Sequence, residues 1–225
     1  MCECYNEIDE EKKKLIEEHL RLVIKANETM NLTRIDSFED GMLLHVEDSL
    51  TALKEMNSAP GGLYGDLGSG AGYPGIPLGI ATGRKTVLID TRAKKMNTVK
   101  SMIETMGITG QIEVFAGRAE LLARKMGGQF AVLTARALAK LAVLLELSSP
   151  LLKTGGHLIC FKANVDDEEF NRALRLQNKL GMNLISDRSF VLEGGFNRRI
   201  IVFEKYGCAK IKLPRREGAA QKDPL

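Results

Sequence analysis

The most informative stretch of this chain is GDLGSGAGYPGIPL, residues 65–78. It follows a short run that ends at Leu63 and Tyr64, and it leads into a second apolar run, residues 76–81. This order of strand, glycine-rich turn and helix is typical of a nucleotide-binding βα unit. Glycines allow a sharp turn with positive φ and place no Cβ between the backbone and a ligand. The start of the helix then offers unpaired N–H groups to that ligand.

Two ligand classes fit this loop. Gly70 to Gly75 match the dinucleotide pattern G-x-G-x-x-G, which supports a nicotinamide-dependent oxidoreductase. Asp66, placed before the glycines, instead resembles the first motif of class I methyltransferases that use S-adenosylmethionine. A carboxylate there suits a cationic amino acid and a sulfonium, and would sit badly against a pyrophosphate. Asp90, which closes a strand at 86–90, can accept both ribose hydroxyls of either ligand. No phosphate-binding G-x-x-x-x-G-K-[ST] motif is present, which argues against a P-loop kinase or GTPase.

The composition predicts one soluble domain with room for a small appendage. The chain has 225 residues, of which 44% are hydrophobic and 27% charged. No apolar run approaches the roughly 18 residues that a membrane helix needs. The acidic N-terminus does not resemble a signal peptide, so we expect a cytoplasmic protein with no membrane partner.

Cysteine and histidine spacing predicts no structural metal. Cys2 and Cys4 are too close for ordinary zinc spacing, and the three histidines share no ligand spacing. The charge pattern is more informative than the net charge of +3. Basic residues gather at 84–85, at 92–100 and at 205–222, which fits a polyanionic partner.

The first 57 residues read as a helical cap. Apolar residues recur at helical spacing over 8–30, and Ser37 to Asp40 resemble a capping box that opens a second helix ending near Met56. We expect three parts: the cap at 1–57, a nucleotide-binding domain at 58–205, and a basic, extended tail at 206–225.

From Leu63 onward strands and helices alternate, which predicts a mostly parallel sheet covered on both faces. Parallel strands are expected at 63–67, 86–90, 111–115, 130–134 and 157–162. Two further strands, 183–192 and 198–205, read as an antiparallel hairpin. That ending is unusual among dehydrogenases and is the one expected of the seven-stranded methyltransferase sheet.

Taken in order, the motifs resemble those of the glucose-inhibited division protein B family, the bacterial 16S ribosomal RNA guanine-N7 methyltransferases. Besides the glycine loop, the matching segments are Asn31-Leu32-Thr33, His45-x-x-Asp48-Ser49-Leu50, Lys94-Lys95, Gly117-Arg118-Ala119-Glu120, Ala135-Arg136-Ala137, Gly155-Gly156 with Lys162, and Leu213-Pro214-Arg215-Arg216-x-Gly218. The resemblance implies an α/β class I (Rossmann-like) methyltransferase fold with S-adenosylmethionine as cofactor. It also implies 16S ribosomal RNA as partner, free or within an assembling small-subunit particle, with a monomer as the default state.

The resemblance also implies roles for single residues. Those assigned to the cofactor are Asp66, Gly68, Ser69, Gly70, Gly72, Tyr73, Asp90, Ala119, Glu120 and Arg136. Those assigned to RNA are Lys94, Lys95, Lys162, Arg215 and Arg216. Arg136 is the proposed catalytic residue, next to both cofactor and base.

Several of these residues also have structural interpretations. Glu120 can be a helix N-terminal carboxylate, and Arg136 can pair with Glu146 or Asp66. His45 and Asp48, three apart on one helix face, are expected to brace the cap against the glycine loop.

Guanine N7 carries an exposed lone pair, so its methylation needs positioning rather than a strong general base. The chain indeed lacks an obvious His/Asp or Cys/His catalytic arrangement. Two alternatives remain open from the residues: the oxidoreductase, and a non-catalytic RNA-binding module on a methyltransferase fold.

Overall fold

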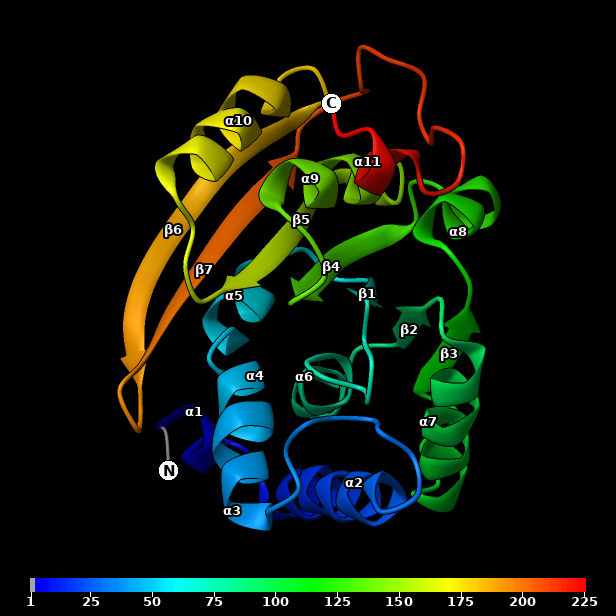
Figure 1. The fold of residues 1–225 in the computed structure, drawn as a ribbon, viewed down its shortest axis with the longest axis vertical. Helices are drawn as coiled ribbons and strands as arrows, with labels where there is room; N and C mark the ends of the chain where they lie inside the picture. The colour runs from blue at the N-terminus through cyan, green and yellow to red at the C-terminus, as the bar shows by residue number, and fades with distance from the viewer. Residues whose placement is uncertain (1–2) are drawn as a thin grey trace.

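The computed structural model describes residues 3–225 and contains one seven-stranded sheet (Figure 1). Cys2, which the sequence predicts not to bind zinc, lies outside the described residues. The strands are β1 (Leu63–Leu67), β2 (Thr86–Asp90), β3 (Ile112–Ala116), β4 (Phe130–Arg136), β5 (Leu152–Lys162), β6 (Met182–Leu192) and β7 (Phe196–Lys205). Their order across the sheet is β3-β2-β1-β4-β5-β7-β6.

The sheet is parallel from β3 to β5, and β7 then runs antiparallel between β5 and β6. Gly65 lies opposite Val87 on one side and Leu133 on the other, whereas His157 faces Glu204 across the antiparallel pair. The predicted parallel sheet with a terminal hairpin is therefore confirmed. The hairpin loop is shorter than predicted, because β7 begins at Phe196.

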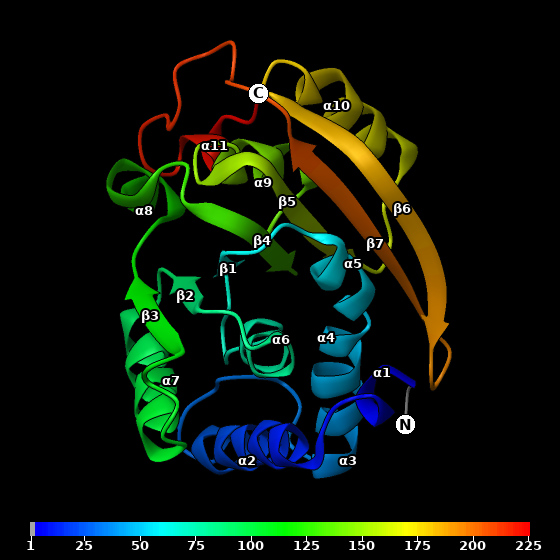
Figure 2. The same cartoon turned by 180° about the vertical axis from the view of Figure 1, so that it is seen from behind.

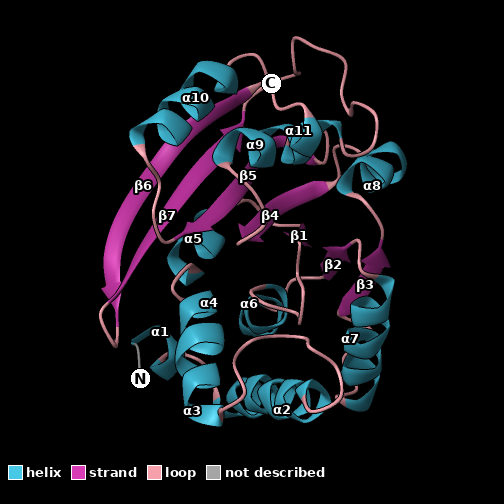
Figure 3. Ribbon diagram, viewed as in Figure 1, coloured by secondary structure: helices cyan, strands magenta, loops and turns pink. Residues whose placement is uncertain are grey.

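Helices cover both faces of the sheet (Figures 2 and 3). One face carries α6 (Gly75–Thr82), α7 (Ala93–Thr105) and the N-terminal helices; the other carries α8 (Ala119–Met126), α9 (Leu141–Ser148), α10 (Asp167–Gln177) and α11 (Ala219–Lys222). Each face buries its own apolar cluster. Because both faces are covered, β2 and most of β4 read as continuous apolar runs without alternation.

The N-terminal segment forms α1 (Glu3–Asn6), α2 (Glu10–Asn27), α3 (Phe38–Gly41), α4 (Asp48–Leu50) and α5 (Leu53–Ser58). The helix predicted over 8–30 is shorter in the structure. Asp9 caps its start by accepting a hydrogen bond from the Lys12 N–H. At its end, the Asn27 side chain accepts the N–H groups of Leu32 at 2.9 Å and Thr33 at 3.1 Å, which turns the chain.

The second predicted helix, 38–56, is not one regular α-helix. Its middle, Met42–Glu47, is π-helical. The helix is interrupted at Ala52, the residue before α5. The hydroxyls of Ser49 and Thr51 donate to the backbone carbonyls of His45 and Asp48. Such bonds compete with regular helical hydrogen bonding, which accounts for the irregular end.

The prediction of an extended tail at 206–225 is wrong. Ala219 and Ala220 in α11 are buried, and Leu213 and Leu225 pack against the apolar cluster beneath α9. The Arg172 guanidinium donates to the Leu225 carbonyl oxygen at 2.7 and 2.9 Å. The tail lacks a periodic pattern because scattered contacts, rather than one helix face, hold it against the domain.

Candidate active site

A cleft of about 320 Å³ lies at the carboxyl ends of β1, β2 and β3. Strand order reverses between β1 and β4, and ligands of open α/β sheets bind at such a switch point. Four predicted cofactor residues line this cleft: Gly68, Asp90, Ala119 and Glu120. The loops that follow three different strands therefore converge at this edge of the sheet.

The glycines of the loop serve different purposes. Gly68 (φ +74°) lines the cleft, and its N–H donates to the Ile89 carbonyl at 2.7 Å. Gly70 (φ +58°) donates its N–H to Asp90 Oδ2 at 3.1 Å. Gly72 has a φ of +97°, which L side chains rarely adopt, and a Cβ there would also lie 2.7 Å from Cδ1 of Ile76. The loop is thus locked onto β2 on one side and onto α6 on the other.

Asp90 is nearly buried, yet its carboxylate remains ionised and accessible from the cleft. Burial alone raises its pKa, but hydrogen bonds from Arg92 and Gly70 outweigh that effect and hold the pKa below its usual value. Arg92 Nε donates to Oδ1 at 3.1 Å, and its terminal nitrogen donates to Oδ2 at 3.0 Å. A ribose diol at Asp90 would share this carboxylate with Arg92, whose largely exposed side chain can move aside.

Asp66 does not line the cleft, although the sequence placed it at the cofactor. It is fully buried beneath the loop, where Thr134 donates to Oδ1 at 2.7 Å and the Gly75 N–H donates to Oδ2 at 3.0 Å. Burial raises its pKa to about 7 despite these two hydrogen bonds. Asp66 therefore positions the start of α6. Ser69 is likewise buried, and its N–H donates to Ile89.

Tyr73 lies between two histidines of the N-terminal segment. Its ring is stacked on His45 at 4.5 Å between centroids and tilted against His19 at 4.7 Å. His19 Nε2 lies 3.0 Å from the Ala71 carbonyl, and His45 Nε2 lies 2.8 Å from the Thr33 hydroxyl. The expectation that His45 braces the cap against the glycine loop is confirmed, and His19 acts in the same way.

Both histidines are held neutral. Burial lowers the pKa of His19 to about 4. Burial, and then the charge of Arg136, lowers the pKa of His45 to about 3. A histidine whose folded pKa lies below its unfolded value contributes full stability above pH 6.5, and loses it as the pH falls toward the folded value.

We expect His19→Gln to show this dependence. Glutamine can still donate to the Ala71 carbonyl, but it binds no proton. The difference in free energy of unfolding between wild type and variant should shrink from pH 7 to pH 5, by up to about 1.4 kcal/mol per pH unit below 6.5. The raised pKa of Asp66 gives stability the opposite dependence on pH. Because Asp66 is present in both proteins, its effect cancels when their free energies of unfolding are subtracted. Urea unfolding at several pH values measures this, and a constant difference would contradict it.

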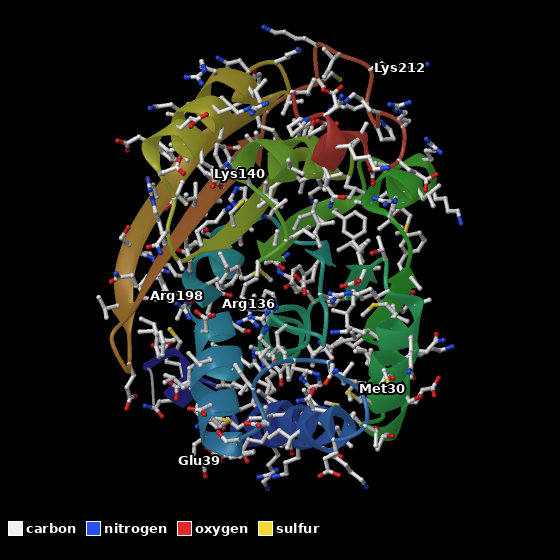
Figure 4. All side chains as sticks on the ribbon, in the orientation of Figure 1. Met30, Glu39, Arg136, Lys140, Arg198 and Lys212 are labelled. Carbon is white, nitrogen blue, oxygen red and sulfur yellow. The ribbon has the colours of Figure 1, made fainter. Side chains whose placement is uncertain are left out.

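Arg136 lies outside the cofactor cleft, in a second cavity of about 670 Å³ (Figure 4). Its guanidinium donates to Asp48 Oδ2 at 2.9 Å and to the Leu44 carbonyl at 3.1 Å. Arg198 from β7 donates to the other oxygen of Asp48 at 2.7 Å. Asp48 thus joins the cap to β4 and β7, and two arginines share one buried carboxylate.

The predicted partners of Arg136 were wrong. Glu146 pairs with Arg215 at 2.7 and 2.8 Å, and Asp66 accepts its hydrogen bonds from Thr134 and from the Gly75 N–H. Sequence spacing could not identify Asp48 as the partner, because the two residues are 88 positions apart and meet only when the cap docks.

The predicted RNA-binding residues fall into two groups. Lys94 and Arg216 are exposed. The other three already have protein partners: Lys95 donates to the Leu32 carbonyl at 2.8 Å, Lys162 pairs with Glu169 at 2.6 Å, and Arg215 pairs with Glu146. Between residues 3 and 225, no group of His, Cys, Asp and Glu could hold a metal ion.

Sequence reasoning missed Ala137, which lines both cavities and has a φ of +53°. It also missed Arg198 and Phe196 in the second cavity, and Gln221 in the cofactor cleft. Arg198 and Phe196 could have been found from the sequence, because aromatic and arginine residues gather around the hairpin loop. Nothing local marked Gln221.

Comparison with known proteins identifies the family. The GidB sequence model, described as rRNA small subunit methyltransferase G, matches residues 12–193. The chain belongs to this family. A ribosomal RNA small subunit methyltransferase G of Carboxydothermus hydrogenoformans is 35% identical over 97% of this chain and 94% of that protein. One from a Thermotoga species is 36% identical over 87% of this chain and 84% of that protein.

Solved structures support the fold assignment for this member of the methyltransferase G family. A precorrin-6y C5,15-methyltransferase of Geobacter metallireducens aligns with a TM-score of 0.52 at 9% identity, over 71% of this chain and 88% of that protein. At such low identity the likeness shows the fold alone. Within the described part of the chain, no helix has the length and apolar character needed to cross a membrane.

Proposed function

We propose that this protein transfers the methyl group of S-adenosylmethionine to N7 of a guanine in 16S ribosomal RNA. The observation that carries the proposal is the meeting of two cavities at Ala137. One cavity has the groups that bind a nucleoside, and the other is lined by arginines and an exposed phenylalanine. Ala137 itself holds a backbone conformation that alanine rarely adopts, and such strain clusters at functional sites.

The residues of the first cavity fit the cofactor. Its volume of about 320 Å³ lies within the range of small-molecule sites. Asp90 supplies an ionised carboxylate for the ribose, Gly68 leaves room for the ligand, and Glu120 supplies a second carboxylate in the lining of the cleft. Membership of the methyltransferase G family favours this cofactor over a nicotinamide.

The chain's role in the reaction is positioning. S-adenosylmethionine, when bound, would supply a methyl group on a cationic sulfonium; the lone pair of N7 would take that methyl carbon as its bond to sulfur breaks, leaving a thioether and a positively charged guanine. The walls around Ala137 must hold the base in line with that methyl group. Such alignment can contribute about 7–11 kcal/mol to lowering the barrier. No general base is required, which agrees with neutral, structurally engaged histidines.

Arg136 and Arg198 suit a guanine-binding cavity. Their planar guanidiniums can hold a phosphate or the guanine O6, which leaves N7 free. Asp48 neutralises one of the two charges and fixes both side chains. Phe196, 41% exposed at the cavity edge, offers a ring on which an unstacked base can lie, as in single-stranded RNA recognition.

We propose an unpaired guanine of 16S ribosomal RNA as the substrate, within the bare RNA or a partly assembled particle in the cytoplasm. The protein is proposed to act as a monomer. Removing one exposed basic residue should then weaken RNA binding without changing which base is modified.

Lys94→Ala is expected to reduce the slope of log affinity against log salt concentration by about 0.7–0.9, the value for one lost phosphate contact. Lys95→Ala is the matched control, because the Lys95 ammonium already donates to the Leu32 carbonyl. The salt-dependence slope of this variant should change less than that of Lys94→Ala. Filter binding of 16S ribosomal RNA between low and physiological salt measures both slopes. Equal slopes for Lys94→Ala and wild type would remove Lys94 from the interface.

The function itself is tested by transfer of labelled methyl groups to 16S ribosomal RNA from cells that lack the protein. Mass spectrometry should locate one new 7-methylguanosine, and RNA from cells containing the protein should accept none. The melting temperature measured with each cofactor distinguishes the methyltransferase from the oxidoreductase. Stabilisation by NAD, with none by S-adenosylhomocysteine, would favour the oxidoreductase. Cofactor binding without transfer to any ribosomal RNA would favour the non-catalytic module.

A further inference from the structure

The C-terminal segment reaches the cofactor cleft. In Figures 1 and 2, α11 lies beside α8 and α9. Gln221 of α11 lines the cleft together with Gly68, Asp90 and Glu120. Its Oε1 lies 3.5 Å from a guanidinium nitrogen of Arg118, which also lines the cleft. A residue from the end of the chain thus forms part of a site otherwise built by strands β1 to β4.

The same segment fixes a carboxylate of the cleft. The Gly218 N–H donates to Glu120 Oε1 at 2.7 Å. Within residues 3–225, no hydrogen bond reaches the second oxygen, Oε2, so this oxygen remains able to accept an N–H from a ligand. Gly218 has a φ of +72°, and a Cβ there would lie 3.3 Å from Arg118. Glycine adopts this positive φ without strain, and in that conformation its N–H reaches Glu120.

The segment is anchored on both sides of this contact. Before it, Arg215 binds the buried carboxylate of Glu146 through two hydrogen bonds, at 2.7 and 2.8 Å. After it, Arg172 holds Leu225. Between these anchors Ala219 and Ala220 are buried. The anchors keep Gly218 and Gln221 in register with the cleft, so the segment is a fixed wall of the site.

We propose that residues 218–221 form the adenine-binding wall of the cofactor cleft. Gly218 orients the Glu120 carboxylate toward the exocyclic amine of the adenine, and the Gln221 amide contacts the edge of the purine. Gly218 is a positioning residue that acts through Glu120, and Gln221 is a contact residue. This inference rests on the proposed function, because it takes S-adenosylmethionine as the ligand.

Gln221→Ala tests the contact. Gln221 is exposed, so the variant should melt like wild type without ligand. Its affinity for S-adenosylhomocysteine, measured by isothermal titration calorimetry, should fall about tenfold, the effect of one lost hydrogen bond of ordinary strength. Lys222→Ala is the matched control, since Lys222 is its exposed neighbour and does not line the cleft; its affinity should be unchanged. Wild-type affinity in Gln221→Ala would overturn the contact.

Deletion of residues 217–225 tests the positioning of Glu120. The deletion should weaken binding of S-adenosylhomocysteine more than Gln221→Ala does. It should also reduce the preference for this ligand over its inosine analogue, which presents an oxygen where adenine has the amine. Glu120→Gln should lower the preference for S-adenosylhomocysteine over the inosine analogue in the full chain. In the deleted chain the same substitution should lower it little further, because the effects of coupled residues are not additive.

The outcomes separate the two proposals. Failure of wild type to bind S-adenosylhomocysteine would overturn the proposed function. Normal binding by wild type, with additive effects of the deletion and Glu120→Gln, would overturn only the role of Gly218. Hydrogen exchange gives a readout independent of affinity: the ligand should increase protection at residues 218–221, and unchanged protection there would count against the proposal.

Discussion

Gly68→Val is expected to weaken binding of S-adenosylmethionine by at least about 100-fold, which corresponds to about 2.7 kcal/mol. Gly68 lines the cofactor cleft with a φ of +74°, a conformation that a β-branched residue avoids. A Cβ at this position would also lie 2.8 Å from Cδ1 of Leu138, a neighbouring residue that also lines the cleft. The substitution therefore both strains the turn and narrows the cleft.

Gly83→Val is the matched control for Gly68→Val. Gly83 has nearly the same φ, +69°, but a Cβ there meets no atom within 4 Å, and the residue ends α6 away from the cleft. It should carry a similar backbone strain and keep wild-type affinity. Isothermal titration calorimetry of both variants, with melting curves, separates binding from folding. Wild-type affinity in folded Gly68→Val would show that the cofactor does not approach this turn.

Arg136→Ala is expected to lower single-turnover methyl transfer to 16S ribosomal RNA by at least about 100-fold, since small misplacement of a reacting group has effects of this size. Affinity for S-adenosylhomocysteine should change little, because Arg136 lines the second cavity and not the cofactor cleft. The variant should also lose roughly 1–3 kcal/mol of stability, because Asp48 and Leu44 lose a buried donor. Asp48 keeps Arg198, which limits the loss.

Arg188→Ala is the structural control for Arg136. Arg188 makes a similar set of bonds, to Glu55 at 2.9 and 3.1 Å and to the Thr51 carbonyl at 2.8 Å, but it lines neither cavity. It should lose comparable stability and retain methyl transfer. Arg136→Lys should restore transfer poorly, because lysine keeps the charge but not the planar fork. Equal loss of transfer in Arg188→Ala and Arg136→Ala would assign Arg136 to cap docking alone.

The fold could be predicted because its signals are local. Residues 65–78 mark a strand, a turn and a helix within one short segment, and the later strands read as apolar runs bounded by turns. Parallel strands place their following loops at one edge, so Gly68, Asp90 and Glu120 could be brought together without coordinates. Helix irregularities were less predictable. The π-helical turn at Met42–Glu47 leaves no periodic signature of its own, and the hydroxyls of Ser49 and Thr51 disturb the end of that helix.

By itself, the sequence determined the sheet, the family and the cofactor cleft, because each depends on residue types at short, regular spacing. Only the tertiary structure decided which charged groups meet. Arg136 binds Asp48 instead of Glu146, Asp66 braces α6 beneath the cleft, and Gly218 brings the chain's end to Glu120. The Arg136–Asp48 and Gly218–Glu120 contacts join positions that are 88 and 98 residues apart along the chain. A buried charge takes whichever partner the packed elements bring within hydrogen-bond distance, and no local pattern encodes that choice.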